Sequence, residues 1–227
     1  MTRIRFSISL LGLLFATAPA ADAASLCESG ARQSPIDITA TRKQVLPALD
    51  FRYTAAPLKI ANDGHTVRVR FGRGQELRIG NQRYALQQFH FHTPGGDRIA
   101  GEEFPMVAHL LHRSATGQLV GVAVLLRAGV ENPFMARLLP RIPAKADGDH
   151  LVAGATIDAS GLLPTERRYF RYLGSLTAPP CTEGVDWIVM KQPIEISAAQ
   201  LAQYRRRFSD NMRAAQPLNG RVVLESR

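Results

Sequence analysis

Two short segments of this chain carry histidines in the alternating pattern of a β-strand. In an extended strand, side chains two residues apart point to the same face. In residues 88–92, His90 and His92 therefore share one face with Gln88, and the two phenylalanines between them point the other way, into a core. The pattern predicts a strand with one apolar face and one face that carries imidazoles.

The second segment, residues 106–112, is also strand-like and puts His109 on one face with Val107 and Leu111. If the two strands are neighbours, three imidazoles converge on one point. His112 falls on the opposite face from His109, which indicates a structural role for His112.

Three neutral imidazole nitrogens with a vacant fourth position describe a catalytic zinc site rather than a closed structural one. Water at the open position becomes acidic enough to supply hydroxide near neutral pH. The alternative is that these are ordinary core or surface histidines, which is the more common situation for any one histidine in a strand. Two on one face, with a third on the next predicted strand, favour the metal site.

The first residues have the features of a secretory signal peptide. A basic start is followed by a short apolar run over residues 6–18 and by small residues, with cleavage expected after Ala23. Residues 1–23 are therefore predicted to be removed, and residues 24–227 to form one domain. We expect a periplasmic or secreted protein without a transmembrane segment, since no later run approaches the length that spans a membrane.

The chain has two cysteines, Cys27 and Cys181. In a protein bound for an oxidising compartment the default expectation is one disulfide, and the alternative is a pair of buried thiols. The formal charge of +9 permits contact with anions. Nucleic acid is not expected as a partner, because the basic residues are scattered and their one cluster, residues 205–207, fits a solvated helix face.

Short strand candidates separated by turn signals follow one another from Phe51 onward, and no internal repeat or linker interrupts them. A capping box at residues 197–200 opens a helix that is expected to end near Phe208. The chain is therefore predicted to be mainly β with short helices. The expected strands cover residues 65–71, 76–79, 84–92, 106–112, 118–126, 169–173, 185–190 and 221–224.

Several segments, taken in order along the chain, resemble the α-class carbonic anhydrases. They are residues 33–38 (QSPIDI), 62–67 (NDGHTV), 88–92 (QFHFH), 108–112 (AHLLH), 173–183 (LGSLTAPPCTE), 211–213 and 216–221 (QPLNGR). The resemblance spans nearly the whole mature chain. It implies a single domain around a twisted, mostly antiparallel central sheet of about ten strands, and reversible hydration of carbon dioxide to bicarbonate and a proton.

The resemblance also implies a role for individual residues. His90, His92 and His109 would bind Zn²⁺, with Gln88 and the backbone of Asn211 anchoring the first two imidazoles. Thr177 would accept a hydrogen bond from the attacking hydroxide, and His65, sharing a strand face with Val67 and Val69, would shuttle protons. Bacterial members pair cysteines at the positions of Cys27 and Cys181. The apolar pocket for carbon dioxide would be lined by Leu111, Gly121, Leu176, Val185 and Trp187, with extra room at Gly121.

Two positions depart from the family pattern. Gly96 stands where the family has a glutamate that accepts the threonine proton, although Asp97, Glu102 and Glu103 lie nearby in the sequence. Val107 stands where a glutamate anchors the third imidazole, and loss of such a partner commonly weakens metal binding or activity ~10–100-fold. The stretch before residue 33 is also short, which predicts altered proton transfer.

Three functions follow. The leading hypothesis is an exported zinc carbonic anhydrase of reduced efficiency that acts on a small molecule. The second is a zinc-binding relative that serves as a binding module with little or no catalysis, which the two lost glutamates favour. The third is a metal-sequestering exported protein, which the placement of the ligands on rigid strands disfavours.

Overall fold

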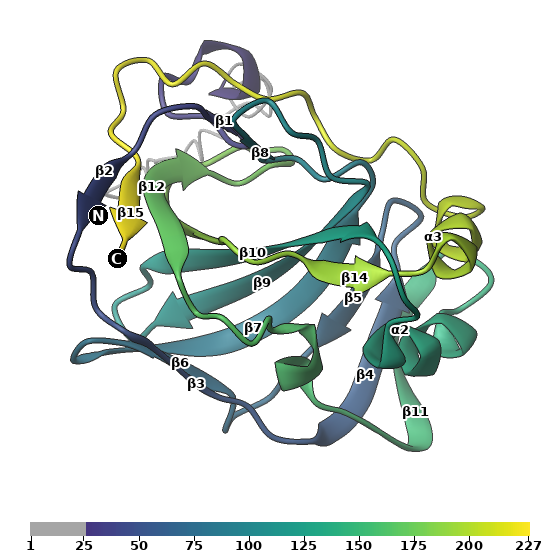
Figure 1. The fold of residues 1–227 in the computed structure, drawn as a ribbon. Coiled ribbons are helices and arrows are strands. Elements are labelled where there is room, and N and C mark those ends of the chain that lie inside the picture. Colours follow the sequence, from purple (N-terminus) through teal and green to yellow (C-terminus); the bar gives the residue numbers. More distant parts are fainter. Residues whose placement is uncertain (1–25) are drawn as a thin grey trace, which may run out of the picture.

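A large twisted sheet organises residues 26–227, the part of the chain that this computed structural model describes (Figure 1). The predicted signal peptide, residues 1–23, lies outside the described residues. Helices are few and short, so the predicted mainly β fold with short helices is confirmed. None of the helices in residues 26–227 combines the length and the apolar character needed to cross a bilayer.

Within the described residues, ten strands follow one another across the sheet, and most neighbours are antiparallel. Their order is β11 (Asp147–Ile157), β4 (Ala56–Asn62), β5 (Val67–Arg70), β7 (Gln82–His92), β9 (Met106–Ser114), β10 (Leu119–Ala128), β13 (Glu183–Met190), β12 (Tyr169–Ser175), β15 (Leu224–Ser226) and β2 (Arg42–Gln44). The parallel pairs are β10 with β13 and β15 with β2.

Shorter elements complete the fold. β6 (Glu76–Ile79) pairs with β7 and with β3 (Leu49–Arg52). β14 (Ile194–Ile196) pairs in parallel with the last residues of β10. A separate small sheet joins β1 (Asp37–Ile38) to β8 (Arg98–Ile99). Residues 26–29 are helical, and the further helices of the described chain are α2 (Pro133–Leu138) and α3 (Ala198–Arg205), with 3₁₀ turns η1 (Leu139–Arg141) and η2 (Ala159–Leu162).

The two faces of the sheet have different surroundings, which explains the alternation in the sequence. On one face, Phe89 and Phe91 are fully buried in a large core that includes Val67, Val69 and side chains of α2 and α3. On the other face, Val107 and Trp187 belong to a second, smaller core. The histidines lie on this second face, so packing of the phenylalanines against the helices fixes the direction of the imidazoles.

Strands β7 and β9 are direct neighbours, as the sequence predicted. They are antiparallel, and the register places His90 opposite His109 and His92 opposite Val107. The predicted helix after residue 197 is also present. Its capping box is formed by Ser197 and Gln200, and the helix ends at Arg205, short of the expected end near Phe208.

The strand expected over residues 221–224 shares only Leu224 with β15. Two further local expectations were wrong. The first concerned residues 147–157, where no strand was expected: they form the edge strand β11, on which His150 lies opposite Ile60. That strand is largely exposed, so it lacks the apolar alternation that reveals a half-buried strand. The second concerned His65, which was expected on a strand face with Val67 and Val69. The strand β5 begins only at Val67, and His65 precedes it in a turn.

A disulfide joins Cys27 to Cys181 with a Cα–Cα distance of 5.1 Å, which confirms the expected pairing. Arg213 reinforces this junction, because its Nη2 donates to the Cys27 carbonyl oxygen at 2.6 Å. Gln33 donates from Nε2 to the carbonyl oxygen of Cys181 at 3.1 Å. The start of the described chain is thereby fixed beside the loop that follows β12.

Candidate metal centre

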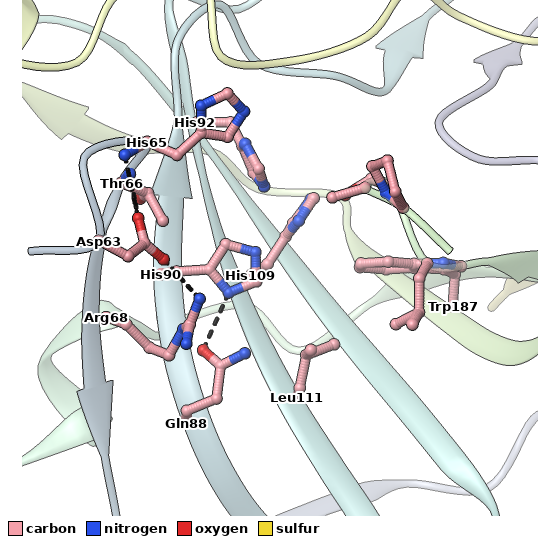
Figure 2. Close-up of a pocket in the computed structure, with 14 residues that line it drawn as sticks. Asp63, His65, Thr66, Arg68, Gln88, His90, His92, His109, Leu111 and Trp187 are labelled. Carbon is pink, nitrogen blue, oxygen red and sulfur yellow. Dashed lines mark hydrogen bonds and ion pairs between the residues drawn. The ribbon is translucent and has the colours of Figure 1, made fainter. Parts of the chain in front are cut away.

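Three imidazoles from two neighbouring strands meet at one point (Figure 2). His90 and His92 come from β7 and His109 from β9, and one ring nitrogen of each lies within 4.8 Å of the others. The ring centroids are 4.8 Å apart for His90 and His92, and 4.9 Å apart for His92 and His109. This spacing surrounds a single point with three nitrogen donors.

Hydrogen bonds hold two of the rings in a defined orientation. His90 Nδ1 lies 2.9 Å from Gln88 Oε1, and His92 Nδ1 lies 2.9 Å from the backbone oxygen of Asn211. Because these partners are acceptors, both Nδ1 atoms carry the proton and both Nε2 atoms present lone pairs to the shared point. His92 Nε2 is buried and has no hydrogen-bond partner among the described residues.

His109 lacks such an anchor. Both of its ring nitrogens are buried without a hydrogen-bond partner in the described part of the chain. Val107, two residues earlier on the same face, offers only methyl groups. After one nitrogen of His109 binds an ion, the other stays unsatisfied, which costs about 1–3 kcal/mol for a buried polar group.

Burial keeps the three imidazoles neutral. Desolvation lowers the pKa of His92 to about 4, and it holds the pKa of His90 and of His109 well below the usual range. Neutral imidazoles are the form that binds metals. Three neutral nitrogen donors around one point, of which those of His92 and His109 are buried without a partner among the described residues, fit a divalent ion such as zinc.

A cavity of about 240 Å³ opens onto the three histidines. Its apolar side is formed by Leu111, Leu176 and Trp187, together with Ala178 and Pro179. The polar side is formed by Asp63, His65, Thr66, Arg68 and Gln88 (Figure 2).

Two expectations about the apolar wall need correction. Gly121 and Val185 are absent from the residues that line the cavity. Val185 is fully buried in the smaller core. A Cβ at Gly121 would lie 2.7 Å from ring atoms of Trp187, so the indole already fills the space that the glycine was expected to leave open.

Thr177 lines the cavity, but its hydroxyl has no carboxylate partner within the part of the chain that the structure describes. Asp97, the nearest sequence candidate, is buried elsewhere and accepts from the Ile36 backbone N–H at 3.0 Å and the Tyr172 hydroxyl at 2.9 Å. Among the remaining candidates, Glu103 pairs with Arg98.

A glutamate side chain at position 96, the usual acceptor for the threonine hydroxyl in the family, would also lack room. A Cβ there would lie 2.8 Å from the terminal methyl group of Met212 and 2.9 Å from Pro35 Cγ. Met212 therefore occupies the space beside Gly96.

His65 lines the cavity from a tightly held turn. Its backbone N–H donates to Asp63 Oδ1 at 3.0 Å, and its carbonyl oxygen accepts from Asn211 Nδ2 at 2.7 Å. Asn211 also anchors His92, so one residue connects the candidate shuttle to a candidate metal ligand. The side chain of His65 is exposed, as exchange of protons with solvent requires.

Sequence reasoning missed Arg68 and Asp63 as parts of the cavity. The signal was present, because Val67 and Val69 face the core and a residue between them must face the opposite side. Arg68 therefore belongs to the face of the sheet that carries the histidines.

Comparisons with known proteins agree with this geometry. The family model described as eukaryotic-type carbonic anhydrase matches residues 20–227. A carbonic anhydrase of Klebsiella pneumoniae is 40% identical over 88% of this chain and 82% of its own length. A hyperthermostable carbonic anhydrase from a hydrothermal vent chimney superposes with a TM-score of 0.87 at 35% identity, over 91% of this chain and 92% of its own. Dioscorin, solved in complex with ascorbate, gives 0.82 at 32% identity, over 88% of each chain. The chain is a member of the eukaryotic-type carbonic anhydrases, the α class of these lyases.

Proposed function

We propose that this protein catalyses the zinc-dependent, reversible hydration of carbon dioxide to bicarbonate and a proton. One observation carries the proposal: three neutral imidazole donors converge at the cavity, beside an apolar wall. Zinc in a site of three histidines with an open position supplies acidified water near neutral pH.

His90, His92 and His109 are the residues that would hold the ion. The anchors Gln88 and Asn211 fix the rings of the first two, so that little reorientation is needed when the metal binds. The apolar side chains of Leu111, Leu176 and Trp187 supply a dry surface for carbon dioxide, which has little capacity for hydrogen bonding.

His65 and Thr177 have the two remaining roles in the proposal. The exposed imidazole of His65 carries the released proton from the cavity to buffer, since an imidazole can accept a proton at one ring nitrogen and release one to solvent. The hydroxyl oxygen of Thr177 would orient the attacking oxygen by accepting a hydrogen bond from it. Without a carboxylate partner for Thr177, this orientation is weaker, and we propose reduced efficiency.

The second candidate is a zinc-binding relative with little or no catalysis, which acts as a binding module. The observations that favour it are the unpartnered nitrogen of His109 and the missing carboxylate beside Thr177. In either case we propose that the protein is exported after removal of residues 1–23, and the disulfide is consistent with an oxidising compartment.

A stopped-flow assay of carbon dioxide hydration on protein of measured zinc content separates the two candidates. Zinc-loaded protein should accelerate hydration, and His65→Ala should slow turnover in weak buffer and recover with added imidazole. Zinc-loaded protein without hydration activity would leave only the binding role. Full turnover in a zinc-free preparation would refute the role of the metal.

A further inference from the structure

Arg68 places a positive charge on the cavity wall. It lies on β5 directly opposite His90 on β7 in the antiparallel register, so the two side chains share a face. Figure 2 shows its guanidinium group beside Asp63 and Gln88 on the polar side of the cavity. The side chain is 31% exposed, which leaves the group accessible to small solutes.

Asp63 occupies one edge of this guanidinium, because Arg68 Nη2 lies 2.5 Å from Asp63 Oδ2. A guanidinium carries five N–H groups and no acceptor. Among residues 26–227, Nε and Nη1 of Arg68 have no hydrogen-bond partner. Arg68 therefore keeps free donors although one of its nitrogens is paired.

Gln88 adds a second donor on the neighbouring strand. Its Oε1 is committed to His90 Nδ1 at 2.9 Å, so the amide nitrogen Nε2 is the part left for other partners. In the described part of the chain this nitrogen has no acceptor. The polar wall next to the histidines thus presents N–H groups from two adjacent strands and the positive charge of Arg68.

We propose that Arg68 and the Gln88 amide form an anion subsite of this cavity for small carboxylate-like monoanions. Bicarbonate, the product of the proposed reaction, has this chemistry, and the inference rests on that proposed function. The planar guanidinium matches the two oxygens of a carboxylate-like group, and hydrogen bonds to charged groups are about twice as strong as neutral ones.

The subsite has a defined kinetic consequence. The reaction equilibrium fixes the ratio of kcat/KM for hydration to kcat/KM for dehydration, so Arg68 does not favour one direction. An interaction with bound bicarbonate lowers the KM for bicarbonate and its inhibition constant as a product. Arg68 therefore determines how readily product accumulates in the cavity.

The direct test is titration of bicarbonate into cobalt-loaded protein, read from the visible spectrum, because zinc itself is d¹⁰ and has no such signal. Arg68→Gln should raise the Kd for bicarbonate about fivefold, an effect kept modest by solvent and by Asp63. Arg70→Gln is the matched control: Arg70 is on the same strand, pairs with Asp149 on β11 and loses the same charge outside the cavity.

A second variant should change affinity in the opposite direction. Asp63→Asn removes the charge that competes for Arg68 and keeps the side-chain oxygen that accepts from the backbone of His65 and Thr66. It should bind bicarbonate about threefold more tightly. Asp149→Asn is its control.

Equal bicarbonate affinity in Arg68→Gln and Arg70→Gln, or in Asp63→Asn and Asp149→Asn, would overturn the subsite. Circular dichroism verifies the fold, and if Arg68→Gln unfolds, the Asp63→Asn pair decides. Wild-type protein that binds bicarbonate through Arg68 but hydrates no carbon dioxide would refute the proposed function and support the subsite. Active protein with affinity independent of Arg68 would refute the subsite alone.

Discussion

The anchoring of the imidazoles predicts how metal affinity responds to reciprocal substitutions on neighbouring strands. Gln88 precedes His90 by two residues on β7 and accepts from its Nδ1 at 2.9 Å. Val107 precedes His109 by two residues on β9 and accepts nothing. Gln88→Val therefore gives His90 the environment of His109, and Val107→Gln offers His109 the partner that His90 has.

The expected magnitudes follow from burial. Removal of a metal ligand's hydrogen-bond partner weakens metal binding ~10–100-fold, and every tenfold corresponds to about 1.4 kcal/mol. Because His90 is partly accessible, water replaces some of the lost bond, and Gln88→Val should weaken zinc binding about tenfold. His109 is 1% exposed and Val107 is fully buried, so no water substitutes there. Val107→Gln should tighten binding by about the same factor, since it removes a penalty of about 1–3 kcal/mol at the cost of burying an amide.

The assay is competition for zinc between the protein and a chromophoric chelator at fixed pH. Gln87→Val is the matched control, because Gln87 is exposed and its side chain bonds only its own strand, through Nε2 to the Ala85 oxygen. Wild-type affinity in Gln88→Val would refute the reasoning, since it would show that the hydrogen bond to His90 does not support the metal.

Three further predictions concern stability. Serine substitution of Cys27 and Cys181 removes a disulfide that links residues 154 apart, whose stabilisation is about 5 kcal/mol in the chain-entropy model. Urea unfolding should give a free energy of unfolding about 2–5 kcal/mol lower than that of wild type. An unchanged urea midpoint would count against this prediction. Burial raises the pKa of Asp97 from 3.8 to about 6, so its contribution to stability is greatest below pH 3.8 and is lost as pH rises through 6. The free energy of unfolding of Asp97→Asn should therefore rise by about 3 kcal/mol relative to that of wild type as the pH increases from 3.5 to 7. Denaturant titrations at several pH values measure this change, and a difference that stays constant with pH would contradict the shift. Gly96→Glu should lower the melting temperature, because overpacking against Met212 costs about 1–3 kcal/mol. Adding Met212→Ala to this variant should recover part of the loss. A Gly96→Glu variant as stable as wild type would show that the site has room for the side chain.

Much of the candidate site was predictable from the sequence because a strand has a period of two. That period put His90 and His92 on one face and Phe89 on the other, and it distinguished His109 from His112. In the structure, His112 lies on the face of β9 that packs into the larger core, and its Nε2 lies 2.5 Å from the Tyr53 hydroxyl oxygen. Position on a strand face is thus a property that local sequence determines.

Other features depend on which side chain from elsewhere in the chain fills a space, and no local period carries that information. The indole of Trp187 occupies the room beside Gly121, and Met212 occupies the room beside Gly96. The turn that holds His65 depends on Asp63 and on Asn211, which is 146 residues away. Resemblance to a family located these residues but did not show how the replacements pack.

The role of Arg68 shows an intermediate case. Its position between two buried valines indicated its face, but its relation to the metal centre depended on the pairing of β5 with β7, which brings it opposite His90. Residue pairs across a sheet follow from the register, and only the folded chain fixes the register.

The zinc content of the purified mature protein tests the central claim most directly. Equilibrium dialysis followed by elemental analysis should find about one zinc ion per chain, as expected for a single site of three histidines. His109→Ala should lose it, and His150→Ala, which alters an exposed histidine on β11, should retain it. A wild-type protein without zinc, or a His109→Ala variant that binds it as tightly as wild type, would contradict the account.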